Sequence, residues 1–342
     1  MASEKALPLA SGDAVTVRER LFSGGLEMYL QPVVDLRTGD VSKIEALARL
    51  DMNGRIILPG NFLPLLTDED LALLFRRGLE QCLLWLKTND ARGAVWKKIG
   101  LSINMPPSYL IGEGSVSLIG EALARYDIEP SRLTIEILET HRISTARQGE
   151  AIRALKAIGV LIGLDDLGSG HSSLLRLANH PFDIIKLDRG LLTNMQTRPV
   201  QVFSVVRSLL SLAHDLNCQV VVEGLENAGM IEAMRFIGCE YGQGFGLATP
   251  MAQSVFEEWM ARRQPVQLGM AGKDAEITTA LGACAYLWAT MHGGTRTPEQ
   301  EQRAVSMCHA FGGISAALVA ADSLKPLGDW LVGRVTGSDA RM

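Results

Sequence analysis

The chain has 342 residues, of which 47% are hydrophobic and 21% are charged, a composition typical of a globular protein and unlike that of a disordered one. Its formal net charge of −5 comes without any block of basic residues, which argues against a nucleic-acid polymer as partner and leaves room for a small anionic ligand if metal ions supply positive charge. No apolar run is long enough to span a bilayer and no signal peptide is visible, so we expect a cytoplasmic protein.

Short apolar segments alternate with helical patterns through most of the chain. The predicted strands are Glu27–Asp35, Val41–Leu50, Ile99–Met105, Leu133–Leu138, Leu161–Asp166, Ile184–Asp188, Gln219–Glu223 and Glu240–Phe245. The predicted helices are Asp68–Lys87, Val116–Tyr126, Gln148–Ile158, Ser172–Leu177, Val200–Leu216, Ala228–Ile237 and Gln253–Arg263. A tight turn is all that separates the first two strands, so they should pair antiparallel. Eight strands in about 250 residues predict an α/β fold, a (β/α)8 TIM-like barrel with an antiparallel first strand.

The helical pattern continues beyond the predicted barrel. We expect an N-terminal extension or short leading helix at 1–16, the barrel at 17–264, a linker at 265–275 and a small α-helical C-terminal segment at 276–342. Apolar stripes run from Ile277 to Met291 and from Val305 to Leu318, and a third short helix is predicted around Trp330. Packing, dimerisation and regulation through a partner all stay open for this segment. The five cysteines form no CxxC pair, so buried reduced thiols are predicted.

Oxygen-bearing side chains recur where the predicted strands end. They are Glu45, Asn104, Glu136, Asp165, Asp166, Glu223 and Gln243, and Lys186 lies at the end of the sixth strand. The carboxyl ends of barrel strands meet on one face, so these side chains should converge there. Oxygen ligands without histidine or cysteine favour Mg²⁺ or Mn²⁺ over zinc. Two ions bridged by adjacent aspartates would activate a water for phosphoryl displacement, with the lysine near the developing negative charge.

The chain resembles the EAL domain family of bacterial cyclic-di-GMP phosphodiesterases over about residues 21–263. The resemblance rests on Glu45-Ala46-Leu47 within YLQPVVDLRTGDVSKIEALARL and on further blocks in the family's order. These blocks are SINMPP, TIEILE, GLDDLGSGHSSL, PFDIIKLDR, VVVEGLEN and GQGFG. It implies metal-dependent hydrolysis of cyclic di-GMP to linear pGpG with two metal ions, and a homodimer.

The resemblance also implies roles for individual residues. Those that would hold the first ion are Glu45, Asn104, Glu136 and Asp165, and those that would hold the second are Asp165, Asp166 and Glu223. The implied catalytic set is Glu45, Lys186, Glu223, Gln243 and Glu139; within it, Lys186 and Gln243 would place the attacking water, and Glu139 would steady the loop after Asp166. Substrate contacts are implied for Gln31, Leu47, Arg49 and Asp188. Glu226 resembles a comparable supporting position after the seventh strand.

Some positions depart from the family pattern without touching a metal ligand. The loop reads DDLGSGHSS where DDFGTGYSS is more usual, so Leu167, Ser169 and His171 differ, and Leu50 stands where Trp is common. These changes bear on loop rigidity, dimer coupling and turnover. Two other functions stay open: a catalytically weak or inactive receptor that binds cyclic di-GMP and acts through a protein partner, and an enolase-like barrel in which Lys186 abstracts a proton.

Overall fold

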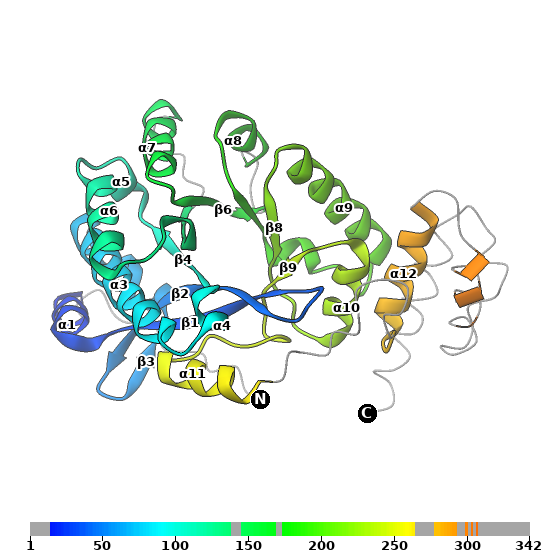
Figure 1. Cartoon of the computed structure of the whole chain (residues 1–342), viewed down its shortest axis with the longest axis horizontal. Helices are drawn as coiled ribbons and strands as arrows, with labels where there is room; N and C mark the ends of the chain where they lie inside the picture. Colours follow the sequence, from blue (N-terminus) through cyan, green and yellow to red (C-terminus); the bar gives the residue numbers. More distant parts are fainter. Residues whose placement is uncertain are drawn as a thin grey trace.

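A computed structural model describes residues 14–137, 145–168, 173–263 and 277–292, together with residues 298, 299, 302, 303 and 306. Its centre is a closed ring of eight strands covered on the outside by helices (Figure 1). In order around the ring these strands are β1 (Leu26–Asp35), β2 (Val41–Met52), β4 (Gly100–Met105), β5 (Leu133–Ile137), β6 (Leu161–Leu167), β7 (Ile184–Leu187), β8 (Gln219–Val222) and β9 (Tyr241–Gly242). The predicted barrel is confirmed.

Strand β1 runs against both of its neighbours, β2 and β9, while the strands from β2 round to β9 pair in parallel. The predicted antiparallel first strand is therefore confirmed, and its cause is the short turn at 36–40, which leaves no room for a helix. The pairing sets Gln31 opposite Glu45. Beyond the ring, β2 turns back into the short strand β3 (Arg55–Ile57), a hairpin that the sequence analysis missed.

The helices follow the barrel rhythm with a few short additions. They are α1 (Ala14–Arg20), α2 (Pro59–Phe62), α3 (Asp68–Asp90), α4 (Ala94–Lys97), α5 (Pro107–Leu110), α6 (Ser115–Tyr126), α7 (Thr145–Ala157), α8 (Ser173–Asn179), α9 (Pro199–Asp215), α10 (Ala228–Ile237), α11 (Gln253–Arg262) and α12 (Ala280–His292). Brief 3-10 or π segments are η2 (Leu21–Gly25), η3 (Leu63–Leu65), η4 (Pro130–Arg132) and η5 (Arg189–Leu192). The four-residue helices were not predicted because they are too short to show a helical period.

Two predicted boundaries need correction. Glu45 does not end its strand: β2 continues to Met52, because its outer half pairs with β1 and β3 instead of turning into a helix. The last strand is two residues long rather than Glu240–Phe245, and the chain after it passes so close to Leu225 that a Cβ at Gly244 would lie 2.3 Å from the Leu225 nitrogen. The linker 265–275 and the stripes from 305 onward lie outside the described residues.

The interior of the barrel is layered because side chains alternate along a strand. A floor residue lies on the same face two residues from each site residue, before it on the parallel strands and after it on the antiparallel β1. On three of the strands the floor is apolar, with Val33, Ile184 and Val221 packed together as a small cluster of their own. On β2 the floor residue is Lys43, whose ammonium donates to the Thr134 hydroxyl at 3.4 Å. Burial lowers the pKa of Lys43 to about 8, although the Glu136 carboxylate opposes the shift.

Candidate metal and catalytic site

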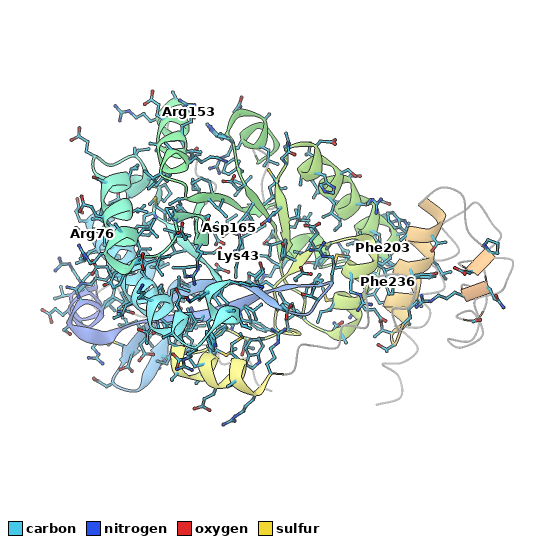
Figure 2. All side chains as sticks on the ribbon, viewed as in Figure 1. Lys43, Arg76, Arg153, Asp165, Phe203 and Phe236 are labelled. Carbon is cyan, nitrogen blue, oxygen red and sulfur yellow. The ribbon has the colours of Figure 1, made fainter. Side chains whose placement is uncertain are left out.

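The predicted oxygen ligands meet around the ammonium of Lys186 at the carboxyl ends of the strands. Lys186 Nζ lies 2.7 Å from Glu223 Oε1, 3.1 Å from Glu136 Oε2, 3.2 Å from Glu45 Oε2 and 3.2 Å from Asp165 Oδ1. The lysine is only 2% exposed. Asp165 and Lys43 both appear near the middle of the barrel in Figure 2. Five strands thus contribute to one buried cluster of opposite charges.

Two amide side chains hold Glu45 in place, and a third accepts from one of them. Gln243 Nε2 donates to Glu45 Oε2 at 2.7 Å and to Gln31 Oε1 at 3.0 Å, and Asn104 Nδ2 donates to Glu45 Oε1 at 3.1 Å. The amide oxygens of Asn104 and Gln243 are buried and accept no hydrogen bond from the described residues. A buried acceptor without a donor is costly. The Asn104 oxygen is therefore a suitable ligand for a hard cation.

Asp165 and Asp166 both face the site because the backbone is irregular between them. In a regular strand, adjacent side chains point to opposite faces. Here the pairing of β6 with β7 shifts register between Leu164 and Leu167, and Asp166 has a left-handed φ of +60°. As a result, one carboxylate oxygen each from Asp165, Asp166 and Glu223 lies within 4.8 Å of the others, a group that could hold a metal ion.

The pKa shifts show that the site carries more negative charge than one ammonium can neutralise. Burial raises the pKa of Glu136 well above its usual range and that of Glu223 to about 7, and the neighbouring carboxylates add to both shifts. Burial also raises the pKa of Asp166, helped by the charge of Asp165. At Glu45 burial is outweighed by Lys186 and by the hydrogen bond from Gln243, so the pKa is lowered. An additional cation would stabilise the ionised carboxylates.

A cavity of about 240 Å³ opens over this cluster. Its lining combines the charged side chains at the strand ends with residues of the loops that follow the strands. Those residues are Gln31, Glu45, Leu47, Asp165, Lys186, Arg189, Glu223, Gly224, Glu226, Gln243, Gly244 and Phe245. Phe245 is 67% exposed, so its ring is available to a ligand at the rim. The cavity offers carboxylates below, and a guanidinium and an aromatic ring around the opening.

The predicted substrate-binding residues fall into two groups. Gln31 and Leu47 line the cavity, whereas Arg49 and Asp188 lie outside its lining. Arg49 follows Leu47 on the same face of β2, where its guanidinium lies 5.3 Å from the centroid of the Tyr29 ring and donates to the Ala48 carbonyl. Asp188 borders an adjoining cavity of about 610 Å³, and its carboxylate accepts from the Gly190 nitrogen at 2.8 Å. Glu139 lies outside the described residues.

The sequence analysis assigned no role to four residues of the cavity lining, Arg189, Gly224, Gly244 and Phe245. Each lies inside a block that it quoted: Arg189 in PFDIIKLDR, Gly224 in VVVEGLEN, and the other two in GQGFG. The sequence blocks therefore contained these residues, but residues in a loop follow no periodic pattern that predicts which side chains point into a cavity. Gly224 is required by geometry: its φ is +72°, and a Cβ there would lie 2.4 Å from Arg189 Cβ.

Comparison with known proteins agrees with this geometry. The chain is 33% identical over 246 residues to the cyclic di-GMP phosphodiesterase RocR of Pseudomonas aeruginosa, covering 70% of this chain and 61% of that protein. It is 32% identical over 243 residues to the bifunctional diguanylate cyclase/cyclic di-GMP phosphodiesterase MucR of the same species, covering 69% of this chain and 34% of that protein. The chain thus spans less than two thirds of either relative's length.

A solved structure described as "PaMucR Phosphodiesterase, c-di-GMP complex" superposes with a TM-score of 0.65 at 28% identity, covering 71% of this chain and 99% of that one. In the part of the chain that the structure describes, no helix is long and apolar enough to cross a membrane. The EAL domain family model matches residues 14–250. The barrel, the ring of carboxylates around Lys186 and this match together place the chain in the EAL domain family.

Proposed function

We propose that this chain hydrolyses one phosphodiester bond of cyclic di-GMP to give linear pGpG, in a reaction that requires two divalent ions, Mg²⁺ or Mn²⁺. The observation that carries the proposal is the convergence of four carboxylates on Lys186 beneath an open cavity. The names of the relatives RocR and MucR support the choice of substrate. The homodimer and a regulatory partner for the C-terminal helices stay predictions.

The residues present suit two ions. Glu45, Asn104, Glu136 and Asp165 would hold the first, and Asp165, Asp166 and Glu223 would hold the second. Bound ions would lower the pKa of a water and neutralise charge on the phosphate oxygens. Such ions are consistent with the excess negative charge and with the free amide oxygen of Asn104.

The chain's own side chains supply the remaining parts of the chemistry. Lys186 carries a buried positive charge whose pKa is raised well above normal by the surrounding carboxylates despite its burial, so it stays protonated and stabilises negative charge as it develops. Gln243 orients Glu45 through its amide hydrogens. Arg189 at the rim suits a phosphate oxygen, and the exposed ring of Phe245 suits stacking on a guanine base.

The test is incubation of the purified chain with cyclic di-GMP and Mg²⁺ or Mn²⁺, with an EDTA control, followed by chromatography of the products. We expect pGpG only when a divalent ion is present. Glu45→Ala should abolish hydrolysis and keep a native circular dichroism spectrum, whereas the matched change Glu121→Ala on the exposed face of α6 should leave the rate unchanged. Nucleotide that binds but stays intact would favour the receptor instead, and an active, folded Glu45→Ala protein would rule out the metal assignment.

A further inference from the structure

Helix α12 lies beyond residues 14–250 that match the family, yet it is packed closely against the barrel. Its residues Ala283, Cys284 and Ala285 are fully buried, and Trp288 is 2% exposed. The ring of Trp288 lies 5.9 Å from that of Phe203 on α9, and the ring of Tyr286 lies 5.4 Å from that of Phe236 on α10. Phe203 and Phe236 lie on the side of the barrel that faces α12 (Figures 1 and 2). This helix is therefore an integral part of the molecule.

The start of α12 is bound by a carboxylate of the barrel. Glu232, in the middle of α10, is 7% exposed. It accepts hydrogen bonds from the Thr278 nitrogen at 2.7 Å, from the Thr279 nitrogen at 3.0 Å and from the Thr279 hydroxyl. The first amides of a helix have no partner within it, and a negative charge there is stabilising. Glu232 therefore binds the two residues that lead into α12, a helix to which it does not belong, including Thr279, whose hydroxyl oxygen accepts from the Gly282 nitrogen.

A glycine makes this contact possible. A Cβ at Gly282 would lie 2.3 Å from Glu232 Cδ and 2.3 Å from its Oε2, closer than any real contact. The Gly282 nitrogen donates to the Thr279 hydroxyl oxygen at 2.9 Å, so the first turn of α12 is held around the same point. The packing of α10 against α12 thus depends on the buried carboxylate of Glu232 and on the lack of a side chain at Gly282.

The other end of α10 begins at the candidate site. Residues 223–227, which we call the β8–α10 loop, lead from β8 into the helix, and Glu223, Gly224 and Glu226 of this loop line the cavity. Asn227 caps α10 by accepting from the Met230 nitrogen at 3.0 Å. Glu232 lies about 7.5 Å from Asn227 along the helix axis. Because α10 has only ten residues, we expect it to move as a rigid body, so a displacement of Glu232 would also displace the β8–α10 loop.

We propose that α12 clamps α10 through Glu232 and thereby holds the β8–α10 loop in the position that the site requires. Glu232 is then a positioning residue for Glu223 and Glu226, and residues 277–292 are the part of the C-terminal segment through which the barrel is controlled. The effect of this clamp on kcat/KM rests on the proposed function. Its effect on hydrogen–deuterium exchange does not.

Hydrogen–deuterium exchange of the amides at 223–231 tests the clamp directly. Glu232→Leu removes the hydrogen-bonded buried carboxylate, and Gly282→Ala displaces it by the clash of the new methyl group, so each change should speed the exchange of these amides about tenfold. Glu232→Gln keeps one acceptor oxygen and should give an intermediate rate. The matched controls are Asp70→Leu, which removes a buried carboxylate that caps α3, and Gly120→Ala, where the nearest atom to a new Cβ is 3.9 Å away. Neither control should change exchange at 223–231.

Unchanged exchange at 223–231 in the folded Gly282→Ala and Glu232→Gln proteins would overturn the clamp. If the wild-type chain hydrolyses cyclic di-GMP, Glu232→Leu should also lower kcat/KM about tenfold while Asp70→Leu, although less stable than wild type, leaves it unchanged. A wild-type chain without activity would refute the proposed function and leave the exchange result to decide the clamp, so the two failures are distinguishable.

Discussion

At the scale of the residue, Lys186 lies at the centre of the candidate site. A single buried ammonium lies between 2.7 and 3.2 Å from four carboxylates, so it satisfies their charge only in part. A divalent ion bound to the same oxygens would share them with the lysine. Under the proposed function, Lys186 and a bound metal ion would share the same carboxylates. Replacing the lysine should therefore change how much the ion stabilises the chain.

Replacing Lys186 by methionine should lower the free energy of unfolding of the metal-free chain by about 3–5 kcal/mol, because the buried carboxylates lose their partner. Mn²⁺ should then raise the Tm of the variant more than that of the wild type, since the ion no longer competes with an ammonium. Thermal unfolding with and without Mn²⁺ measures both effects. Lys156→Met removes a lysine that pairs with Asp183 at 2.5 Å outside the site, and it should leave the Mn²⁺ response unchanged. Equal Tm shifts in Lys186→Met and wild type would contradict the shared ligand set.

The raised pKa of Glu223 predicts a pH dependence. Burial, with Asp165 and Glu45, moves this pKa from 4.5 to about 7 in the folded chain. The folded, metal-free chain therefore holds this proton more tightly than the unfolded chain, so the stabilisation is fully present below pH 4.5 and is lost as the pH rises through about 7. A metal ion needs the ionised carboxylate, so its affinity should rise over the same interval and then level off. Calorimetric titration with Mn²⁺ at several pH values measures this, and an affinity that stays constant would refute it.

At the scale of the element, backbone irregularities place the functional groups. The shift in register at Asp166 turns two adjacent carboxylates toward one site, and the left-handed φ of Gly224 lets the β8–α10 loop pass against Arg189. In a regular strand, one of the two adjacent carboxylates of Asp165 and Asp166 would have pointed to the outer face of the barrel. The site therefore depends on a few residues whose backbone conformation departs from that of the strand before them.

Gly224→Ala tests this dependence. The new methyl group meets Arg189 Cβ at 2.4 Å in addition to the strain of a positive φ, so we expect a loss of about 2–4 kcal/mol in stability and at least a tenfold lower kcat/KM. Gly54→Ala is the matched control, since Gly54 has a φ of +89° but no atom within 4 Å of a new Cβ. It should cost only about 1 kcal/mol and leave the kinetics unchanged. Equal kinetic effects of the two changes would show that strain alone is responsible.

At the scale of the whole molecule, helix α12 belongs to the fold. Removing residues 264–342 would expose the faces of Phe203 and Phe236 and deprive Glu232 of its donors. We expect a loss of about 3–5 kcal/mol in urea unfolding, the usual cost of removing a buried tryptophan. A chain that ends at residue 292 keeps α12 and should retain most of the stability. If both chains were as stable as the full-length protein, α12 would not contribute to folding, and size-exclusion chromatography of the two would show whether the segment affects dimerisation.

Much of the fold and the candidate site could be predicted because the signals are local. Apolar runs and turns mark the eight ring strands, and the oxygen-bearing residues follow from their places at or near the strand ends. The extension of β2 to Met52 could not be read in this way, because the end of that strand is held by pairing with β3, which was not predicted. The placement of Arg49 over Tyr29 also depends on a neighbouring strand.

By itself, the sequence determined which residues carry charge and oxygen ligands, the order of strands and helices, and the membership in a family that shares them. Only the tertiary structure decided that four carboxylates share one ammonium, that Asp166 turns inward, and that Glu232 binds the residues that lead into α12, outside the matched region. The physical reason is that secondary structure follows from periods of two to four residues along the chain, whereas a hydrogen bond or an ion pair depends on the distance between atoms that only folding brings together.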